Sequence, residues 1–180
     1  MNRSRHLFPL FLLAIFSLSL VPSLGAASSV GDATLLGARA AAADSDATIA
    51  QMLRYAIEDE YLARAEYAVI MAKFGALRPF SNIIKAEESH IAYLREAFAD
   101  ASLALPADFA ASRVSAPATL LAAFQAGKQA EIDNIAMYDG FLASPLLARA
   151  DAAELRALFV RLRDASKNHL RSFDNQLSRY

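Results

Sequence analysis

Two histidines, His90 and His169, stand at matching places in this chain. Glu87 and His90 form a Glu-x-x-His pair within Ala86-Glu87-Glu88-Ser89-His90. Side chains three residues apart leave the same face of a helix. In a second such stretch, His169 stands three residues after Ser166. Carboxylate oxygens and imidazole nitrogens that converge in this way form a ligand set suited to iron or manganese, with zinc as an alternative.

A second spacing repeats on the helices that precede these stretches. Glu60 stands seven residues before Tyr67, and Glu131 stands seven residues before Tyr138. Seven residues make almost two helical turns, so each glutamate shares a face with its tyrosine. We expect the tyrosine hydroxyls to hydrogen-bond to the ligand carboxylates. The predicted metal ligands are Glu60, Glu87, His90, Glu131 and His169, surrounded by Tyr67, Tyr138 and Ser166.

A lone Glu-x-x-His on an alanine-rich helix is more often a solvated pair than a metal site. The repeat of these spacings favours a metal site over a solvated pair, because all five candidate ligands fall on apolar stripes that predict a buried helix face. A carboxylate buried there without a positive partner would cost several kcal/mol. The remaining acidic residues near these stripes are expected to be solvated surface charges: Glu58, Asp59, Glu66, Glu88 and Asp133.

The composition favours a single all-α domain. The 180 residues include only 6 glycines and 6 prolines, and alanine and leucine are abundant. The absence of cysteine excludes disulfides, thiolate metal sites and cysteine nucleophiles. No basic patch indicates nucleic acid as a partner. Metal ions are therefore the expected partners, and a homo-oligomer stays open.

The first 27 residues are typical of a cleavable secretory signal. Arg3 and Arg5 precede an apolar run from Leu7 to Val21, and small residues follow it. The alternative, an uncleaved membrane anchor, is disfavoured because the run is shorter than the ~20 residues that span a bilayer. We expect a periplasmic or secreted protein that leaves the membrane after signal cleavage. Residues 28–45 are rich in alanine, glycine and serine, which predicts a flexible leader.

Residues 46–180 show four long segments with helical periodicity. The first should begin after the cluster Asp44-Ser45-Asp46 and end near Gly75. The second should end near Ala101, and 102–116 lack periodicity, which predicts a long crossover connection. Pro117 suits an early position in the third helix, and residues 151–154 resemble a capping box for the fourth. The predicted architecture is a four-helix bundle with one long crossover between its second and third helices.

These residues resemble the ferritin-like, rubrerythrin-related diiron superfamily. Within it, the resemblance is strongest to an uncharacterised bacterial ferritin-like domain family, over roughly residues 46–180. The stretches that carry it are Glu60-Tyr61-Leu62-Ala63-Arg64 with Tyr67, Asn82-Ile83 before Glu87 and His90, and Ser166-Lys167-Asn168-His169-Leu170 with Phe173.

The resemblance implies two iron ions, one held by Glu60, Glu87 and His90 and the other by Glu131 and His169, with Glu87 bridging. The chain departs from the superfamily at Ser166, where a second bridging carboxylate is expected. This loss either opens a coordination position or weakens the second site until only one metal binds.

The implied function is an oxidoreductase acting on dioxygen, peroxide or ferrous iron. Because the chain has no rubredoxin-like cysteines, its electrons would come from an external donor or from the iron itself. The alternative is a non-catalytic protein that binds or buffers metal in the export compartment, and a third interpretation is a metal-free helical bundle that acts through its surface.

Overall fold

The computed structural model describes residues 35–180, so the predicted signal segment lies outside the described residues. The described residues form α-helices and short 3-10 helices with no β-strand, which confirms the all-α class. The α-helices are α1 (Gly37–Ala43), α2 (Ile49–Phe74), α3 (Phe80–Asp100), α4 (Leu120–Ala143) and α5 (Ala153–Leu177), and the 3-10 helices are η2 (Ala110–Ser112), η3 (Pro145–Ala148) and η4 (Ala150–Ala152). Over the same residues, no helix is both long and apolar enough to cross a membrane.

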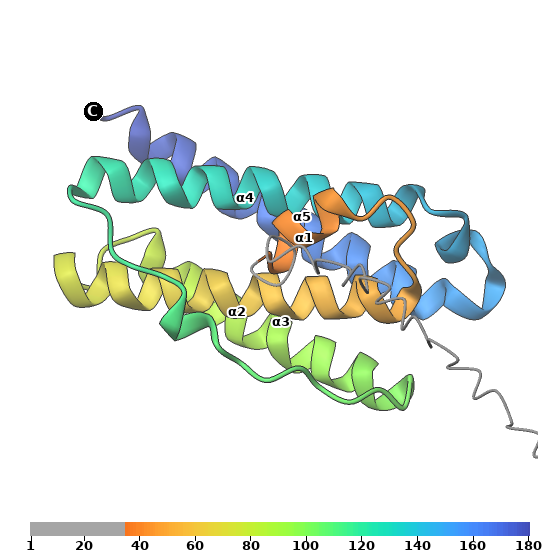
Figure 1. Cartoon of the computed structure of the whole chain (residues 1–180). Coiled ribbons are helices and arrows are strands. Elements are labelled where there is room, and N and C mark those ends of the chain that lie inside the picture. The colour runs from red at the N-terminus through yellow and green to blue at the C-terminus, as the bar shows by residue number, and fades with distance from the viewer. Residues whose placement is uncertain (1–34) are drawn as a thin grey trace, which may run out of the picture.

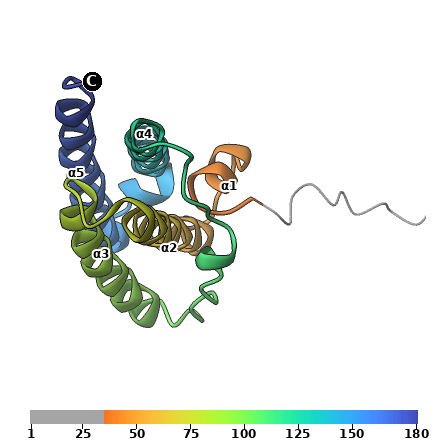
Figure 2. The same cartoon turned by 90° about the vertical axis from the view of Figure 1, so that its left-hand side faces the viewer.

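The long helices are arranged in two antiparallel pairs (Figure 1). One pair is α2 with α3, the other is α4 with α5, and α2 also contacts α4 while α3 contacts α5. Figure 2 shows α2 and α4 nearly end on, with α1 beside them and with α3 and α5 on the other side. Residues 101–119 run back along α2 from the end of α3 to the start of α4, and η2 lies against α2 (Figure 1).

The predicted starts of three helices differ in part from the structure. Helix α2 begins after the aspartate cluster as predicted, but its cap is Thr48, whose side chain accepts a hydrogen bond from the Gln51 backbone N–H in a capping box. Helix α4 begins at Leu120 with Thr119 as its cap, so the early helical position predicted for Pro117 is wrong. Helix α5 begins at Ala153 without a side-chain cap, so the capping box predicted at 151–154 is wrong. The reason is local: η4 occupies this stretch, and Asp151 instead pairs with Arg149 at 2.6 Å.

The predicted flexible leader is wrong over its last part, because α1 is a helix packed against α2 and α4. Gly37 and Ala38 are buried, and the Ala38 backbone N–H donates to Asp59 Oδ1 at 2.8 Å. Gly37 has a positive φ of 57°, and a Cβ there would lie 2.4 Å from Asp59 Oδ1. Glycine is therefore required both by the backbone conformation and by the close approach of α1 to α2.

Two apolar clusters form the core, one toward each end of the long helices. One includes Leu53, Leu94 and Phe159, and the other includes Tyr67, Phe80, Phe124 and Phe173. Along each long helix, the buried polar residues fall between positions that belong to the two clusters. The core is thus an apolar volume interrupted by one polar layer.

Candidate metal centre

The polar layer brings all five predicted ligands together in two groups of three. Glu60, Glu87 and His90 form one group, and Glu87, Glu131 and His169 form the other. In each group the candidate ligand atoms lie within 4.8 Å of one another, and every residue is buried. Each long helix contributes to the layer, because the stripe that packs each helix against its neighbours carries these side chains inward.

Glu87 belongs to both groups because its two carboxylate oxygens face different histidines. Its Oε2 lies 2.9 Å from Nδ1 of His90, and its Oε1 lies 3.3 Å from Nδ1 of His169. The two imidazole rings are stacked, with centroids 5.8 Å apart. Glu87 therefore occupies the central position that a bridging carboxylate would have.

The two groups differ in the distance between the histidine and its second carboxylate, the one that is not Glu87. His90 Nδ1 lies 3.1 Å from Glu60 Oε2, whereas His169 Nδ1 lies 3.5 Å from Glu131 Oε2. Among the described residues, His169 Nδ1 is a buried polar atom without a hydrogen-bond partner. A buried imidazole nitrogen that faces two carboxylates and lacks a hydrogen bond fits a metal ligand, so the residues present suit a bound ion.

The predicted tyrosine hydrogen bonds are present, and each crosses to the other helix pair. Tyr67 on α2 donates to Glu131 Oε1 at 2.7 Å, and Tyr138 on α4 donates to Glu60 Oε1 at 2.9 Å. Both tyrosines are fully buried, and burial raises the pKa of each hydroxyl well above its ordinary value. They therefore remain neutral donors that fix the two carboxylates.

Ser166 makes hydrogen bonds away from the two ligand groups. Its Oγ donates to Asn134 Oδ1 at 2.6 Å and lies 3.2 Å from the carbonyl oxygen of Leu162. Asn134 Nδ2 in turn donates to Asp59 Oδ2 at 2.8 Å, and Asp59 also accepts the bond from Ala38 on α1. A chain of hydrogen bonds thus links the position of the missing carboxylate to α1.

Burial and charge act strongly on the ligands themselves. Burial, with the charge of Glu87, raises the pKa of Glu60 to about 7. Burial lowers the pKa of a histidine, but hydrogen bonds to Glu60 and Glu87 outweigh it and raise the pKa of His90 to about 10. Glu131 and Glu87 similarly raise the pKa of His169 to about 9.

The pKa of Glu87 is shifted in the opposite direction to that of Glu60. Burial raises the pKa of its carboxyl, but the two neighbouring imidazoles, His169 and then His90, outweigh burial and hold the pKa below its ordinary value. In the metal-free centre, imidazolium protons therefore supply the positive charge that the carboxylates require. A metal ion would displace these protons.

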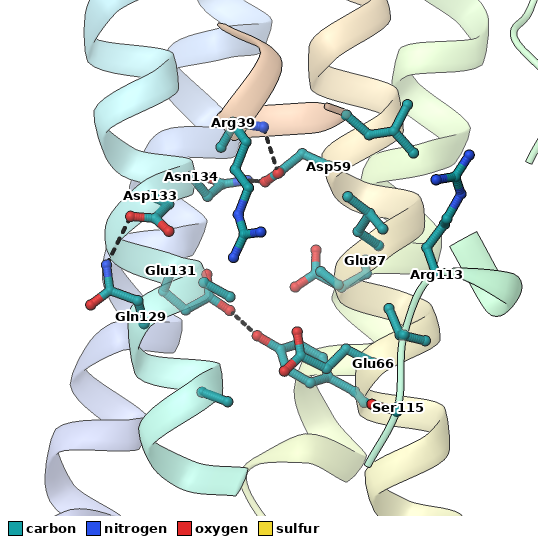
Figure 3. A pocket seen from close by; sticks show the side chains of 18 residues that line it. Arg39, Asp59, Glu66, Glu87, Arg113, Ser115, Gln129, Glu131, Asp133 and Asn134 are labelled. Carbon is teal, nitrogen blue, oxygen red and sulfur yellow. Dashed lines mark hydrogen bonds between the residues drawn. The ribbon is translucent and has the colours of Figure 1, made fainter. Parts of the chain in front are cut away.

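A pocket of about 510 Å³ opens onto the centre from the side where α2 and α4 meet α1 and the connection before α4. Glu87 and Glu131 lie in its inner part (Figure 3), and Tyr67 also lines the pocket. Arg39 on α1 and Arg113 on the connection line its outer part. A small molecule therefore has a route to the group formed by Glu87, Glu131 and His169.

Sequence reasoning missed the role of Asp59 and Asn134. Asp59, expected to be a solvated surface charge, joins α1 to α4, and burial raises its pKa to about 7. Asn134 carried a usable signal, because it lies three residues after Glu131 on the same helix face. Glu58 was also expected at the surface, but it is buried and pairs with Arg54 at 2.7 Å.

The fold and the site define an all-helical protein with two buried carboxylate and histidine groups that could each hold a metal ion. The structure is similar to the crystal structure of the hypothetical protein MJ0754 from Methanococcus jannaschii DSM 2661, with a TM-score of 0.63 and 20% sequence identity. The similarity covers 73% of this chain and 80% of that one. It concerns the fold alone. Neither the protein-family models nor the curated proteins include a match to this chain.

Proposed function

We propose that this chain is a ferritin-like four-helix bundle, with residues 101–119 as its long crossover, that binds two iron ions and acts as an oxidoreductase on dioxygen, peroxide or ferrous iron. The observation that carries the proposal is the pair of buried groups that share Glu87. Bundles build metal sites from glutamates and histidines on facing helices, and this donor set suits iron or manganese.

Each residue has a distinct task in this proposal. Glu60 and His90 would hold one ion and Glu131 and His169 the other, with Glu87 shared between the two groups. Bound iron would supply redox and Lewis-acid chemistry for oxygen species, with electrons from an external donor or from ferrous iron as the substrate. Tyr67 and Tyr138 orient the carboxylates through their hydrogen bonds. The apolar clusters on both sides keep bulk water out, while the pocket admits the small molecule.

A second candidate function is non-catalytic binding of a metal ion. The specific observation in its favour is that Ser166, where a second bridging carboxylate would stand, donates its hydrogen bond to Asn134. With three rather than four carboxylates near the centre, one site would bind more weakly than the other. A protein of this kind would hold one ion tightly and turn over neither peroxide nor ferrous iron.

The first experiment counts metals per chain by elemental analysis after anaerobic iron loading of the domain. The parent should bind about two irons per chain, as two ligand groups of three residues imply. Glu87→Gln should lose both, because Glu87 belongs to both groups. Glu88→Gln is the matched control, since Glu88 is the exposed neighbour on α3 and should leave the metal content unchanged. Equal metal content in the parent and Glu87→Gln would refute the site.

The second experiment separates the two candidate functions by following ferrous iron oxidation and peroxide consumption. The oxidoreductase should show turnover that His90→Ala abolishes, because His90 is the nitrogen ligand of one group. Tight binding of metal without turnover in the parent would favour the non-catalytic function. Turnover that persists in His90→Ala would contradict the proposed centre.

Export by the segment 1–27 also remains part of the proposal. Expression of the full chain in a Gram-negative host, followed by fractionation and N-terminal sequencing, should give a shortened protein in the periplasm. Full-length protein in the cytoplasm would contradict export.

A further inference from the structure

The pocket that opens onto the metal centre carries an excess of negative charge. Two arginines line it, Arg39 and Arg113, and both are exposed. Five acidic residues also line it: Asp59, Glu66, Glu87, Glu131 and Asp133. A cleft lined mainly by one sign of charge focuses the electrostatic field and raises the local concentration of ions of the opposite sign. The pocket is therefore suited to attract cations.

Glu66 differs from the other four carboxylates because it has no partner among residues 35–180. The other four each accept a hydrogen bond or face a histidine. Glu66 is half-buried on α2, and its carboxylate makes no hydrogen bond or ion pair to a described residue. Burial and the charge of Glu131 raise its pKa, so the two carboxylates lie near enough to repel each other. A divalent cation near both carboxylates would offset this repulsion, because carboxylate oxygens are ligands for such ions.

A second observation points to a cation at the inner end of the pocket. His169 is 9% exposed, and its Nδ1 has no hydrogen-bond partner among the described residues. This nitrogen faces Glu87 and Glu131, which lie in the inner part of the pocket. Of the group formed by Glu60, Glu87 and His90, only Glu87 lines the pocket. An ion that enters here therefore reaches the group containing His169 first.

Arg39 carries the charge that opposes such an ion. Figure 3 shows its side chain extending from α1 toward Glu131 and Glu87. The charge of Arg39 lowers the pKa of Glu66, so its guanidinium lies near the carboxylate that has no partner. The hydrogen bond from the Ala38 N–H to Asp59 holds this part of α1 against α2. The guanidinium therefore neutralises part of the negative charge of the pocket and repels an incoming metal ion.

We propose that this pocket is the route by which a divalent cation enters the metal centre, with Glu66 as the carboxylate that receives the ion before it passes to Glu131. Arg39 slows this entry. The inference rests on metal binding in the proposed function but on no reaction of the bound metal. Because Glu66 lies outside the two ligand groups, it governs the rate of loading and leaves the final number of bound ions unchanged.

The test is stopped-flow mixing of the metal-free protein with Co²⁺, a divalent probe ion followed by its visible absorption, at low ionic strength. Glu66→Gln should lower the association rate constant by about three- to tenfold, because an attractive charge is lost from the pocket. Arg39→Gln should raise the rate constant by a similar factor. Glu66→Asp keeps the charge and should load faster than Glu66→Gln. At equilibrium, each variant should bind as many ions per chain as the parent.

Glu96→Gln and Arg95→Gln are the matched controls, because they change the net charge equally at exposed positions of α3. Both should load at the rate of the parent. High salt should reduce the differences among the pocket variants, because it screens their charges. Equal rate constants in Glu66→Gln and Glu96→Gln would overturn the inference. Loss of an ion at equilibrium in Glu66→Gln would also overturn it, since Glu66 would then be a ligand.

Assays of ferrous iron oxidation and peroxide consumption on the same samples keep this inference apart from the proposed function. Loading that depends on Glu66 in a protein without turnover would sustain the inference and refute the oxidoreductase. Turnover in a protein whose loading rate is the same with and without the Glu66 charge would do the reverse.

Discussion

The two helix pairs present almost the same polar residues to the core and differ at one important position. The pair α2 and α3 contributes Glu60, Tyr67, Glu87 and His90, and the pair α4 and α5 contributes Glu131, Tyr138, Ser166 and His169 at the same spacings. Each tyrosine hydrogen-bonds to the glutamate of the other pair, so the halves depend on each other. Of these four equivalent positions, only one differs in charge: Glu87 in the first pair corresponds to Ser166 in the second.

The neighbours of Ser166 show what has replaced the carboxylate. Asp59 and Asn134 form the hydrogen-bond chain from Ser166 to α1, whereas the equivalent positions by spacing in the other pair are Ala130 and Ala63. Those alanines make no side-chain hydrogen bond, and they line the same pocket as Asp59 and Asn134. The asymmetry of the layer therefore serves to anchor α1 at the edge of this pocket.

The sharpest test of this comparison is to restore the match with Ser166→Glu. In the metal-free protein, a fourth buried carboxylate should lower the free energy of unfolding by several kcal/mol, because like charges would be buried together. In the loaded protein it should tighten the second metal on the order of tenfold. Chemical denaturation with and without chelator measures the first effect, and metal titration measures the second. Ser166→Ala, which adds no charge, should show neither.

The stability of the metal-free form should depend on pH differently from that of the metal-loaded form. The pKa of His90 is raised from 6.5 to about 10 and that of His169 to about 9, so their contributions are complete below pH 6.5 and lost as the pH rises through these values. The raised pKa of Glu60 acts in the same sense between its ordinary 4.5 and about 7. The melting temperature of the chelated protein should therefore fall steadily toward alkaline pH.

The loaded protein should not show this fall, because bound metal replaces the imidazolium protons. Metal binding at neutral pH should accordingly release about one proton per histidine bound, measurable in weakly buffered solution. Identical pH dependence with and without metal would show that the histidines are not ligands.

Substitution of each tyrosine tests whether the affinities of the two metal sites can be lowered separately. Tyr67→Phe removes the hydrogen bond to Glu131, and Tyr138→Phe removes the bond to Glu60. Each should weaken its own metal site by about tenfold, since partners of ligand carboxylates typically have effects of this size. Stepwise metal titration should show the weaker second site affected by Tyr67→Phe. The same loss from either variant would mean that the two sites bind as one unit.

A further difference between the two helix pairs concerns packing rather than metal. A Cβ at Gly127 would lie 2.4 Å from the Phe173 ring, whereas the equivalent positions in the other pair are Ala56 and Leu94. Gly127→Ala should lower the free energy of unfolding by about 1–3 kcal/mol through overpacking. Adding Phe173→Leu should recover part of this loss. Gly140→Ala, with open space around its Cβ, should be neutral or stabilising by thermal melting.

The sequence by itself determined the helices and the candidate ligands. Helical periodicity is a local property, so the stripes containing Glu60, Glu87, His90, Glu131 and His169 could be read without any knowledge of the neighbours. The repeat of spacings then indicated that these residues meet. The structure confirms that they do, in two groups that share Glu87.

Only the tertiary structure decided the surroundings of the site. Residues 37–43 lack a large apolar stripe, and they pack against α2 with a hydrogen bond from the Ala38 N–H to Asp59, two residues far apart in the sequence. The partners of Ser166 and the pocket beneath Arg39 also arise where separate helices meet. Hydrogen bonds between distant residues leave no periodic trace, so local sequence patterns reveal the ligands and only the packed fold reveals what surrounds them.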